Sequence, residues 1–430
     1  MGFIRKKLFL AVLRQLDMGR EQFVKNIEAF SEGHYGTMNM KKGLRVMKRD
    51  KKRIAAFCLA FFVMVSAILG GAGESVYGAV VRKSANKNML CGITLDVGNR
   101  YYSVKEIKKY IRLASKSKNG YVQLHFTGDE NVGIECAYLD QTANKNYLHG
   151  TDEYCNPDTG KSFLTKKQIK TILSYAKKKK VAIIPEIDMP GHVGGFEKLY
   201  KNKYGKLNKK IFNKEYEGEL LISNKKAMSF AKAIYKEYMT LFKGCKYFHI
   251  GSDEFWSGSS KKNAKYINEI SKYVKKKGFE VMVWNDLLTK SNIKNIDHDI
   301  IVTYWSYDGD TESKSESKAR KKVRASFPAL QKEGFRVLNY NSYYLYYTPN
   351  LSNTNDEDAE YAVEDAKENW NLLKWNSDSS CKSKTYKNIY GACVSIWGED
   401  SKGVSGKQIY NQIDGLYKLV AKKCKSHKIK

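Results

Sequence analysis

The sequence is poor in several features that would place it in a specialised class of protein. It has only 5 prolines in 430 residues, which excludes collagen-like and proline-rich chains. Its 8 cysteines include no C-x-x-C pair, so zinc-ribbon and thioredoxin-type motifs are absent. No H-x-H or H-E-x-x-H pattern occurs either. We therefore expect no catalytic metal and no organic cofactor.

Long apolar runs are also scarce, and only one could enter a membrane. Residues 54–73 carry no charge and follow directly on Arg53 and the lysines before it. A basic region followed by an apolar run is typical of a signal peptide, and the length also permits a retained anchor. We assign residues 47–80 to a signal peptide or signal anchor. Residues 1–46 are a basic extension that indicates either a start codon placed too early or a cytoplasmic tail.

Negative charge is in short supply along the whole chain. Lysine and arginine number 76 against 45 aspartates and glutamates, which gives a formal net charge of +31. Residues 1–53 account for +9 of this, so the remainder is strongly basic as well. An exported, basic protein is expected at the cell surface or secreted, with an electrostatic affinity for anionic cell wall or matrix. No recognisable nucleic-acid module is present, so we expect no specific nucleic-acid binding.

A linker over residues 81–90 leads into a region, 91–430, in which apolar runs alternate with helical patterns. Strands are predicted at residues 93–97, 121–126, 181–187, 247–250, 281–284, 300–305, 336–341 and 391–397. Helical periodicity is found at residues 107–114, 169–176, 227–242, 263–277, 319–333, 357–375 and 405–423. The link between the fifth and sixth strands leaves room for a short helix or none. This alternation predicts an α/β fold, a single (β/α)8 TIM barrel.

Carboxylates and tryptophans follow the predicted strands, where a barrel of this kind has its active site. Asp253 and Glu254 follow the fourth strand, and Trp284, Trp305 and Trp397 close the fifth, sixth and eighth. Aromatic rings stack on sugar rings, and a carboxylic acid can protonate a glycosidic oxygen. Taken alone, adjacent Asp253 and Glu254 also suit a helix N-cap with acidic first-turn residues. The tryptophans favour a sugar-binding site instead.

Six segments resemble glycoside hydrolase family 20, the β-N-acetylhexosaminidases, and most closely its dispersin branch. They are Y-F-H-I-G-S-D-E-F at 247–255, I-I-P-E-I-D-M-P-G-H at 183–192, W-N-D at 284–286, Y-W-S-Y-D-G-D at 304–310, L-N-Y-N-S-Y-Y-L-Y at 338–346 and S-I-W-G-E-D at 395–400. The segments occur in order from about residue 92 to the C-terminus. Such a match is highly specific.

The resemblance implies a retaining mechanism in which the 2-acetamido group of the substrate is the nucleophile and forms an oxazolinium ion. It implies that Glu254 is the general acid and base and that Asp253 orients the acetamido group. Tyr344 is expected to hold the acetamido oxygen, with Tyr346 as the alternative. The remaining implied residues are the aromatic cage Trp284, Trp305 and Trp397, the hydroxyl-binding Asp310 and Glu399, and the supporting Asp129, His192 and Asp188.

The sequence departs from the family pattern at three places. An arginine that binds sugar hydroxyls is expected after the first strand, but Asn99 stands there and Arg100 comes one residue late. Arg100 reaches the site through a shifted turn, or Asn99 substitutes for it. Ser252 replaces a glycine of the signature. Further on, Trp256 is followed by Ser257, and dispersins tend to carry a tyrosine at the position of Ser257. The rim of the site is therefore expected to select a different leaving sugar.

These features together predict an exported hydrolase of β-linked N-acetylglucosamine, with poly-β-1,6-N-acetylglucosamine of biofilm matrix as its substrate. A hexosaminidase for chitooligosaccharides, cell-wall fragments or host glycans is the alternative. A surface lectin with a degenerate barrel is the third hypothesis, and the intact Asp253 and Glu254 argue against it.

Overall fold

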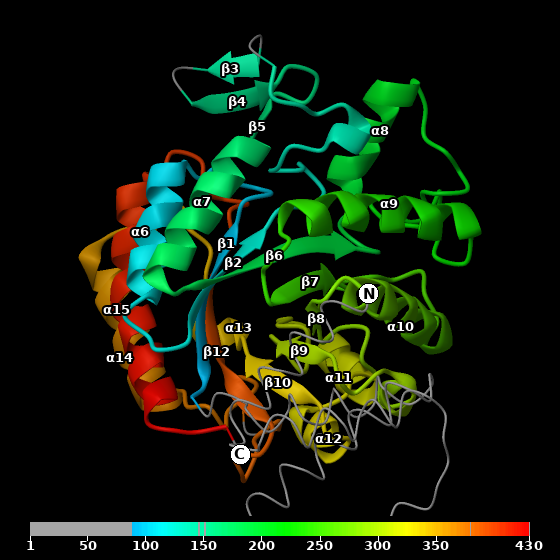
Figure 1. Cartoon of the computed structure of the whole chain (residues 1–430). Helices are drawn as coiled ribbons and strands as arrows, with labels where there is room; N and C mark the ends of the chain where they lie inside the picture. The colour runs from blue at the N-terminus through cyan, green and yellow to red at the C-terminus, as the bar shows by residue number, and fades with distance from the viewer. Residues whose placement is uncertain (1–87, 145–146, 150–151, 379, 430) are drawn as a thin grey trace, which may run out of the picture. The chain divides into compact units, whose positions relative to one another are not determined.

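The computed structural model describes residues 88–144, 147–149, 152–378 and 380–429 (Figure 1). The predicted basic extension, the signal peptide or anchor and most of the 81–90 linker lie outside these residues. None of the helices in the described ranges combines the length and the apolar character needed to span a bilayer.

Eight parallel strands form a closed barrel, as predicted. They are β1 (Leu90–Asp96), β2 (Gly120–His125), β6 (Ala182–Met189), β7 (Tyr247–Gly251), β8 (Glu280–Trp284), β9 (Ile301–Tyr304), β10 (Arg336–Asn339) and β12 (Ile389–Ile396). The ring closes where β12 pairs with β1, in a register that runs from Leu90 opposite Gly391 to Leu95 opposite Ile396. A two-residue strand, β11 (Tyr346–Tyr347), extends the carboxyl end of β12.

Helices cover the outside of this barrel (Figure 1). They are α6 (Val104–Ala114), α7 (Lys166–Lys179), α8 (Gly194–Tyr204), α9 (Lys225–Leu241), α10 (Ser260–Lys275), α11 (Lys314–Val323), α12 (Phe327–Lys332), α13 (Ser342–Leu345), α14 (Asp356–Asn369) and α15 (Gly406–Lys425). Between β8 and β9 there is only a single 3-10 turn, Ile293–Asn295, which confirms the short link. Another 3-10 turn, Ala137–Leu139, follows β2.

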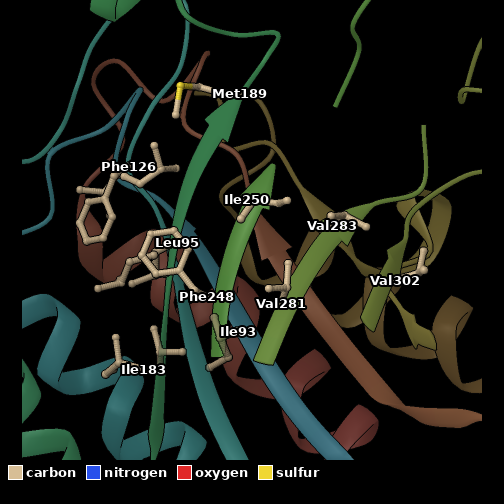
Figure 2. Close-up of a cluster of buried hydrophobic side chains, with 14 of the residues drawn as sticks. Ile93, Leu95, Phe126, Ile183, Met189, Phe248, Ile250, Val281, Val283 and Val302 are labelled. Carbon is tan, nitrogen blue, oxygen red and sulfur yellow. The ribbon is translucent and has the colours of Figure 1, made fainter. Parts of the chain in front are cut away.

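Each strand is buried on both sides, because alternate residues face the helices and the barrel interior. Ile93, Ile183 and Phe248 belong to the apolar layer between strands and helices, part of which Figure 2 shows. Their neighbours in the barrel interior include Ile184 and Trp284, which pack in a separate cluster. The near-continuous apolar runs in the sequence reflect this double burial.

Two predicted helices have different boundaries in the structure. The expected helix at 319–333 is two helices, α11 and α12, because Ser326 caps the start of α12 and Pro328 lies in its first turn. The expected helix at 357–375 ends at Asn369, where α14 stops.

The polar connection at 140–163 contains a small antiparallel sheet that the sequence analysis did not anticipate. It consists of β3 (Leu148–His149), β4 (Glu153–Asn156) and β5 (Lys161–Phe163). This sheet belongs to the segment that follows the carboxyl end of β2.

Candidate active site

A pocket of about 370 Å³ lies at the carboxyl ends of the barrel strands. Its lining residues are Asn99, His125, Gly128, Asp129, Glu130, His192, Asp253, Glu254, Trp305, Tyr346, Thr348, Trp397 and Glu399. The site residues predicted from the sequence that meet here are Asp253, Glu254, Trp305, Tyr346, Trp397, Glu399, Asp129 and His192. Carboxylates and aromatic rings therefore share one cavity.

The turn after β7 brings two successive carboxylates to this cavity. Gly251 and Ser252 have φ values of 72° and 73°, and Glu254 has a φ of 33°. These left-handed conformations break the strand alternation, so Asp253 and Glu254 can serve one pocket. At Gly251 a Cβ would also lie 1.8 Å from Oδ1 of Asp188, so only glycine fits there.

Asp253 lies against a second carboxylate, Asp286, at the end of β8. Burial raises the pKa of Asp253 well above its usual range, and the nearby charge of Asp286 raises it further. Asp286 is itself fixed by an ion pair with Arg324 and by the Nε1–H of Trp305, which donates to it at 2.6 Å. Asp253 Oδ1 is buried without a hydrogen-bond partner among the described residues. Asp253 can therefore hold a proton and still offers one free oxygen to a ligand.

Glu254 lies at the end of a chain of polar side chains. Its Oε2 is 3.7 Å from Nε2 of His192, and Nδ1 of His192 is 2.9 Å from Oδ2 of Asp129. Although burial opposes it, the hydrogen bond with Asp129 raises the pKa of His192 to about 9. Burial and then Asp286 raise the pKa of Glu254, while His192 opposes the rise. Such a carboxyl suits a general acid that must keep its proton near neutral pH.

Three aromatic rings enclose the pocket. Trp305 and Tyr346 lie nearly parallel, with ring centres 6.5 Å apart, and Trp397 meets Tyr346 at 5.5 Å and 60°. His125 contacts the Trp397 ring edge-on at 5.2 Å. The Arg324 guanidinium lies 5.0 Å from the Trp305 ring centre. This arrangement offers apolar surfaces to the faces of a sugar ring and to a small methyl group.

A buried ionic network supports the aromatic wall from the barrel interior. Glu186 accepts hydrogen bonds from Gln123 at 2.7 Å and from the Nε1–H of Trp284 at 2.5 Å. Its Oε2 is 3.0 Å from Nδ1 of His125. Burial opposes the charge of His125, but Glu186 raises the pKa of this imidazole to about 10. His249 behaves differently: burial lowers its pKa to about 4, and its Nδ1 accepts the Gly251 N–H at 3.0 Å.

Several predicted site residues lie outside the pocket lining. Trp284 is fully buried beneath the pocket, with its ring 6.1 Å from that of Trp397. Arg100 donates to the carbonyls of Ser401 and Val404, so its guanidinium is held away from the pocket and Asn99 lines it instead. Of the two alternatives for this turn, the structure has Asn99 rather than the Arg100 guanidinium at the pocket.

The structure also separates the two candidate tyrosines. The Tyr344 hydroxyl donates to the carbonyl of Ser377 at 3.4 Å and accepts from Lys374 at 2.6 Å, so it is engaged outside the pocket. Tyr346 lines the pocket, and this corrects the preference for Tyr344.

Asp310 and Asp188 are the other two predicted residues outside the lining. The Asp310 carboxyl faces Ser342 and Tyr343, and burial raises its pKa. Asp188 is buried below the catalytic turn, with neither oxygen hydrogen-bonded among the described residues. Burial raises the pKa of Asp188 to about 7. Asp188 therefore does not line the pocket, but its charge contributes to the raised pKa of Asp253 in the turn after β7.

Several residues that line or support the pocket were not predicted from the sequence. His125 and Gln123 both face the barrel interior, and they alternate along β2 with Val122 and Leu124, which belong to the outer apolar layer. This alternation was the available signal. Arg324 lies between α11 and α12, 38 positions from its partner Asp286, and nothing local marks that ion pair. Thr348 follows β11, a strand too short to be anticipated.

Two trios of side chains have metal-ligand atoms close together. One is His125, Glu186 and Asp188; the other is Asp188, His192 and Asp253, each with its atoms within 4.8 Å. In the first trio Glu186 already receives two side-chain N–H donors, which suits an internal ion pair. The expectation that no metal takes part stays a prediction.

Comparison with known proteins agrees with this geometry. Residues 91–411 match the catalytic-domain model of glycosyl hydrolase family 20. The crystal structure of Dispersin B is similar, with a TM-score of 0.75 and 36% identity over 78% of this chain and 99% of that one. A lacto-N-biosidase of Bifidobacterium bifidum is 26% identical over 59% of this chain and 23% of its own length. A β-hexosaminidase of Vibrio furnissii is 30% identical over 26% of this chain and 20% of its own length.

The chain spans only about a fifth of the length of these two curated relatives, so their whole-protein activities do not transfer directly. The family model, by contrast, covers nearly all of the barrel and every element that supplies the pocket. The chain therefore belongs to glycosyl hydrolase family 20.

Proposed function

We propose that this protein is an exported β-N-acetylhexosaminidase that cleaves β-linked N-acetylglucosamine polymers by a substrate-assisted, retaining mechanism. The observation that carries the proposal is the turn after β7, which presents Asp253 and Glu254 to one pocket walled by Trp305, Tyr346 and Trp397. The similarity to Dispersin B, with 36% identity over 78% of this chain, supports the proposal.

The proposed reaction begins with proton transfer from Glu254. Its carboxyl proton goes to the glycosidic oxygen as the bond from that oxygen to C1 breaks, and the leaving sugar departs as an alcohol. The acetamido carbonyl oxygen of the sugar that carries C1 attacks this carbon and forms the oxazolinium ion. Glu254, now a carboxylate, takes a proton from a water molecule. The oxygen of this water attacks C1 and opens the oxazolinium ring, which restores the acetamido group. The raised pKa of Glu254 suits the first of these steps.

Asp253 and Tyr346 position the acetamido group in this proposal. The free Oδ1 of Asp253 accepts the acetamido N–H. That hydrogen bond and the positive charge that grows on the oxazolinium ion both favour the ionised form of Asp253. The Tyr346 hydroxyl donates to the acetamido oxygen, and the rings of Trp305 and Trp397 contact the methyl group and the sugar. Glu399 and Asn99 are available for sugar hydroxyls.

The decisive test is Glu254→Gln, which keeps the shape of the side chain but cannot donate the proton. Release of N-acetylglucosamine should fall by about 10²–10⁴-fold. Glu368→Gln, at an exposed position of α14 outside the pocket, is the matched control and should retain most of the activity. Full activity in Glu254→Gln would defeat the assignment.

Linkage preference is tested by product analysis on poly-β-1,6-N-acetylglucosamine beside chitooligosaccharides. Preferential cleavage of the β-1,6 polymer supports a biofilm-matrix hydrolase. Cleavage of β-1,4 substrates alone keeps the mechanism and moves the role to chitin, cell-wall or host-glycan turnover. Saccharide binding without cleavage of either would favour the lectin hypothesis.

Export and surface association complete the proposal. The basic residues before the apolar run at 54–73 support export, and the net charge of +31 supports retention by anionic wall or matrix polymers. Cell fractionation tests the first, and salt elution from whole cells tests the second.

A further inference from the structure

Helix α11 contributes nothing to the apolar core, although it follows a barrel strand like the helices that do. None of its residues from Lys314 to Val323 is buried. Its sequence, K-S-E-S-K-A-R-K-K-V, holds one acidic residue, Glu316, among five basic ones. A helix that is polar on every side gains stability from side-chain pairs along the helix, such as Glu316 with Arg320, rather than from burial in the core.

The charged residues of α11 divide between two faces of the helix. Arg320 lies one turn after Glu316 and pairs with it, and its guanidinium stacks on Trp256 at 5.3 Å. Arg324, one turn further on, pairs with Asp286 beside the catalytic turn. This face supports the active-site pocket. Residues 314, 317, 318, 321 and 322 follow the other helical spacing, i, i+3, i+4, i+7 and i+8, and share the opposite face.

That second face lines a separate cavity of about 460 Å³. Its six lining residues are Lys290, Lys314, Ser317, Lys318, Lys321 and Lys322. Lys290 comes from the segment after β8, and its ammonium group donates to the carbonyl of Lys321 at 2.7 Å. The cavity thus lies where two segments meet, and apart from one serine every lining side chain is a lysine.

Among the residues that the structure describes, most of these ammonium groups lack a counter-charge. Lys321 pairs with Asp308 at 3.4 Å and Asp378 at 3.2 Å. In the ranges that the structure describes, the other four lysines of the cavity have no carboxylate within ion-pair distance. Like charges one helical turn apart, such as Lys314 with Lys318 and Lys318 with Lys322, destabilise a helix. A bound anion would relieve this repulsion.

We propose that this lysine-lined cavity is a binding site for a phosphate-bearing polymer without bases, such as a polyol phosphate. This inference rests on the association with an anionic surface proposed above, and it gives that association a defined location on the protein. Lysine binds phosphate as a point charge, and the described lining of the cavity contains no arginine whose planar fork would favour bidentate recognition. Sites for single-stranded nucleic acid add aromatic rings on which bases stack, and none of the lining residues is aromatic.

The position of α11 gives the site a consequence for catalysis. The anion face lies on the same short helix as Arg320, which packs over Trp256, and Arg324 directly after this helix pairs with Asp286. A polymer bound to the lysines would therefore keep the catalytic pocket within one helix diameter of the anionic surface. The enzyme would work while tethered beside the material that carries the phosphates.

The test is binding of the full chain to poly(glycerol phosphate), measured by calorimetry at low and at physiological salt. The triple variant K314Q/K318Q/K322Q removes three unpaired charges and should bind about tenfold more weakly, with a shallower salt dependence. The control K170Q/K177Q/K178Q removes the same charge from exposed positions of α7 and should stay within about twofold of the wild type. Equal losses in both variants would overturn the site.

Two further measurements test the class of ligand and separate this inference from the proposed catalytic function. If a single-stranded DNA of equal charge binds more tightly than poly(glycerol phosphate), the proposed class of ligand is overturned. The same holds if inorganic phosphate binds with the same affinity as the polymer. Hydrolysis of a chromogenic N-acetylglucosaminide is measured in parallel and should be unchanged in K314Q/K318Q/K322Q. Because the two readouts are independent, failure of hydrolysis in the wild type would count against the catalytic proposal alone.

Discussion

The proton on Glu254 is controlled by charges of opposite sign within the same pocket. Burial and Asp286 raise the pKa of Glu254, and His192, Arg320 and Arg324 lower it. His192 lies 3.7 Å from the carboxyl, and with a pKa of about 9 it is positive at neutral pH. The range of pH over which Glu254 can act as an acid is therefore set in part by this imidazole.

Replacing His192 with glutamine should move the alkaline limb of the pH profile of kcat/KM to higher pH. Loss of the positive charge raises the pKa of Glu254, so its proton is retained to a pH higher by about one unit. The rate at the optimum should also fall, because His192 helps to orient the carboxyl. The control is His298→Gln, a histidine outside the pocket. An unchanged alkaline limb in His192→Gln would show that this imidazole does not tune Glu254.

Trp256 is expected to act on the leaving sugar. It is 58% exposed and lies two residues after Glu254, and its backbone N–H donates a hydrogen bond of 2.6 Å to the Glu219 carboxylate. The Arg320 guanidinium packs over its ring. A rigid, exposed indole beside the proton donor suits stacking on the sugar that receives the proton.

Trp256→Ala should therefore lower kcat/KM for an N-acetylglucosamine oligomer by about tenfold, through KM, and leave an aryl N-acetylglucosaminide little changed. The matched control is Tyr361→Ala on α14, an aromatic residue with 73% exposure away from the pocket. If oligomer and aryl substrates lose activity equally, Trp256 acts through Glu254 instead.

The candidate site could be predicted from sequence only where its residues follow strands directly. Asp253, Trp305 and Trp397 were found this way, because a barrel gathers the residues that follow its strands. Residues that reach the pocket through pairing of distant segments left no local signal, as Arg324 shows. Side-chain direction was equally hidden: Arg100 and Asn99 are neighbours in the chain, and only the hydrogen bonds of Arg100 determine which of them faces the pocket.

At the scale of the elements, the turn after β7 combines a left-handed backbone with a tight contact. Gly251→Ala should destabilise the protein by at least about 2 kcal/mol more than Gly160→Ala, as measured by urea unfolding. Both glycines have positive φ, 72° and 65°, but the space around Gly160 is open, whereas a Cβ at Gly251 would meet Asp188. Equal costs in the two variants would mean that the contact with Asp188 relaxes easily.

The strands were more predictable than the helices, for a physical reason. Strands buried on both faces need continuous apolar runs, and all eight barrel strands were found from these runs. Helix α11 buries nothing, so it has no apolar stripe, and its boundaries were merged with those of α12. Ser326 and Pro328 were the local signal for the break between them.

At the scale of the whole molecule, the net charge of +31 is a source of repulsion in the folded state. Raising NaCl from about 10 to 150 mM should increase the Tm by a few degrees, since the Debye length falls from about 30 to 8 Å. Differential scanning calorimetry provides the measurement, and sucrose at equal osmolality is the control for effects other than screening. A Tm that stays constant or falls with salt would show that the surface carboxylates already neutralise the repulsion locally.

The seam between β12 and β1 also determines when the pocket can exist. Asp96 accepts the N–H of Gly398 at 2.8 Å across 302 positions of the chain. Asn99 enters the pocket from one side of that seam, and Trp397 and Glu399 enter from the other. A chain whose last barrel strand has not yet been made lacks one wall of the pocket. Assembly of the pocket therefore waits until β12 pairs with β1, and a partly synthesised barrel offers no site for the proposed reaction.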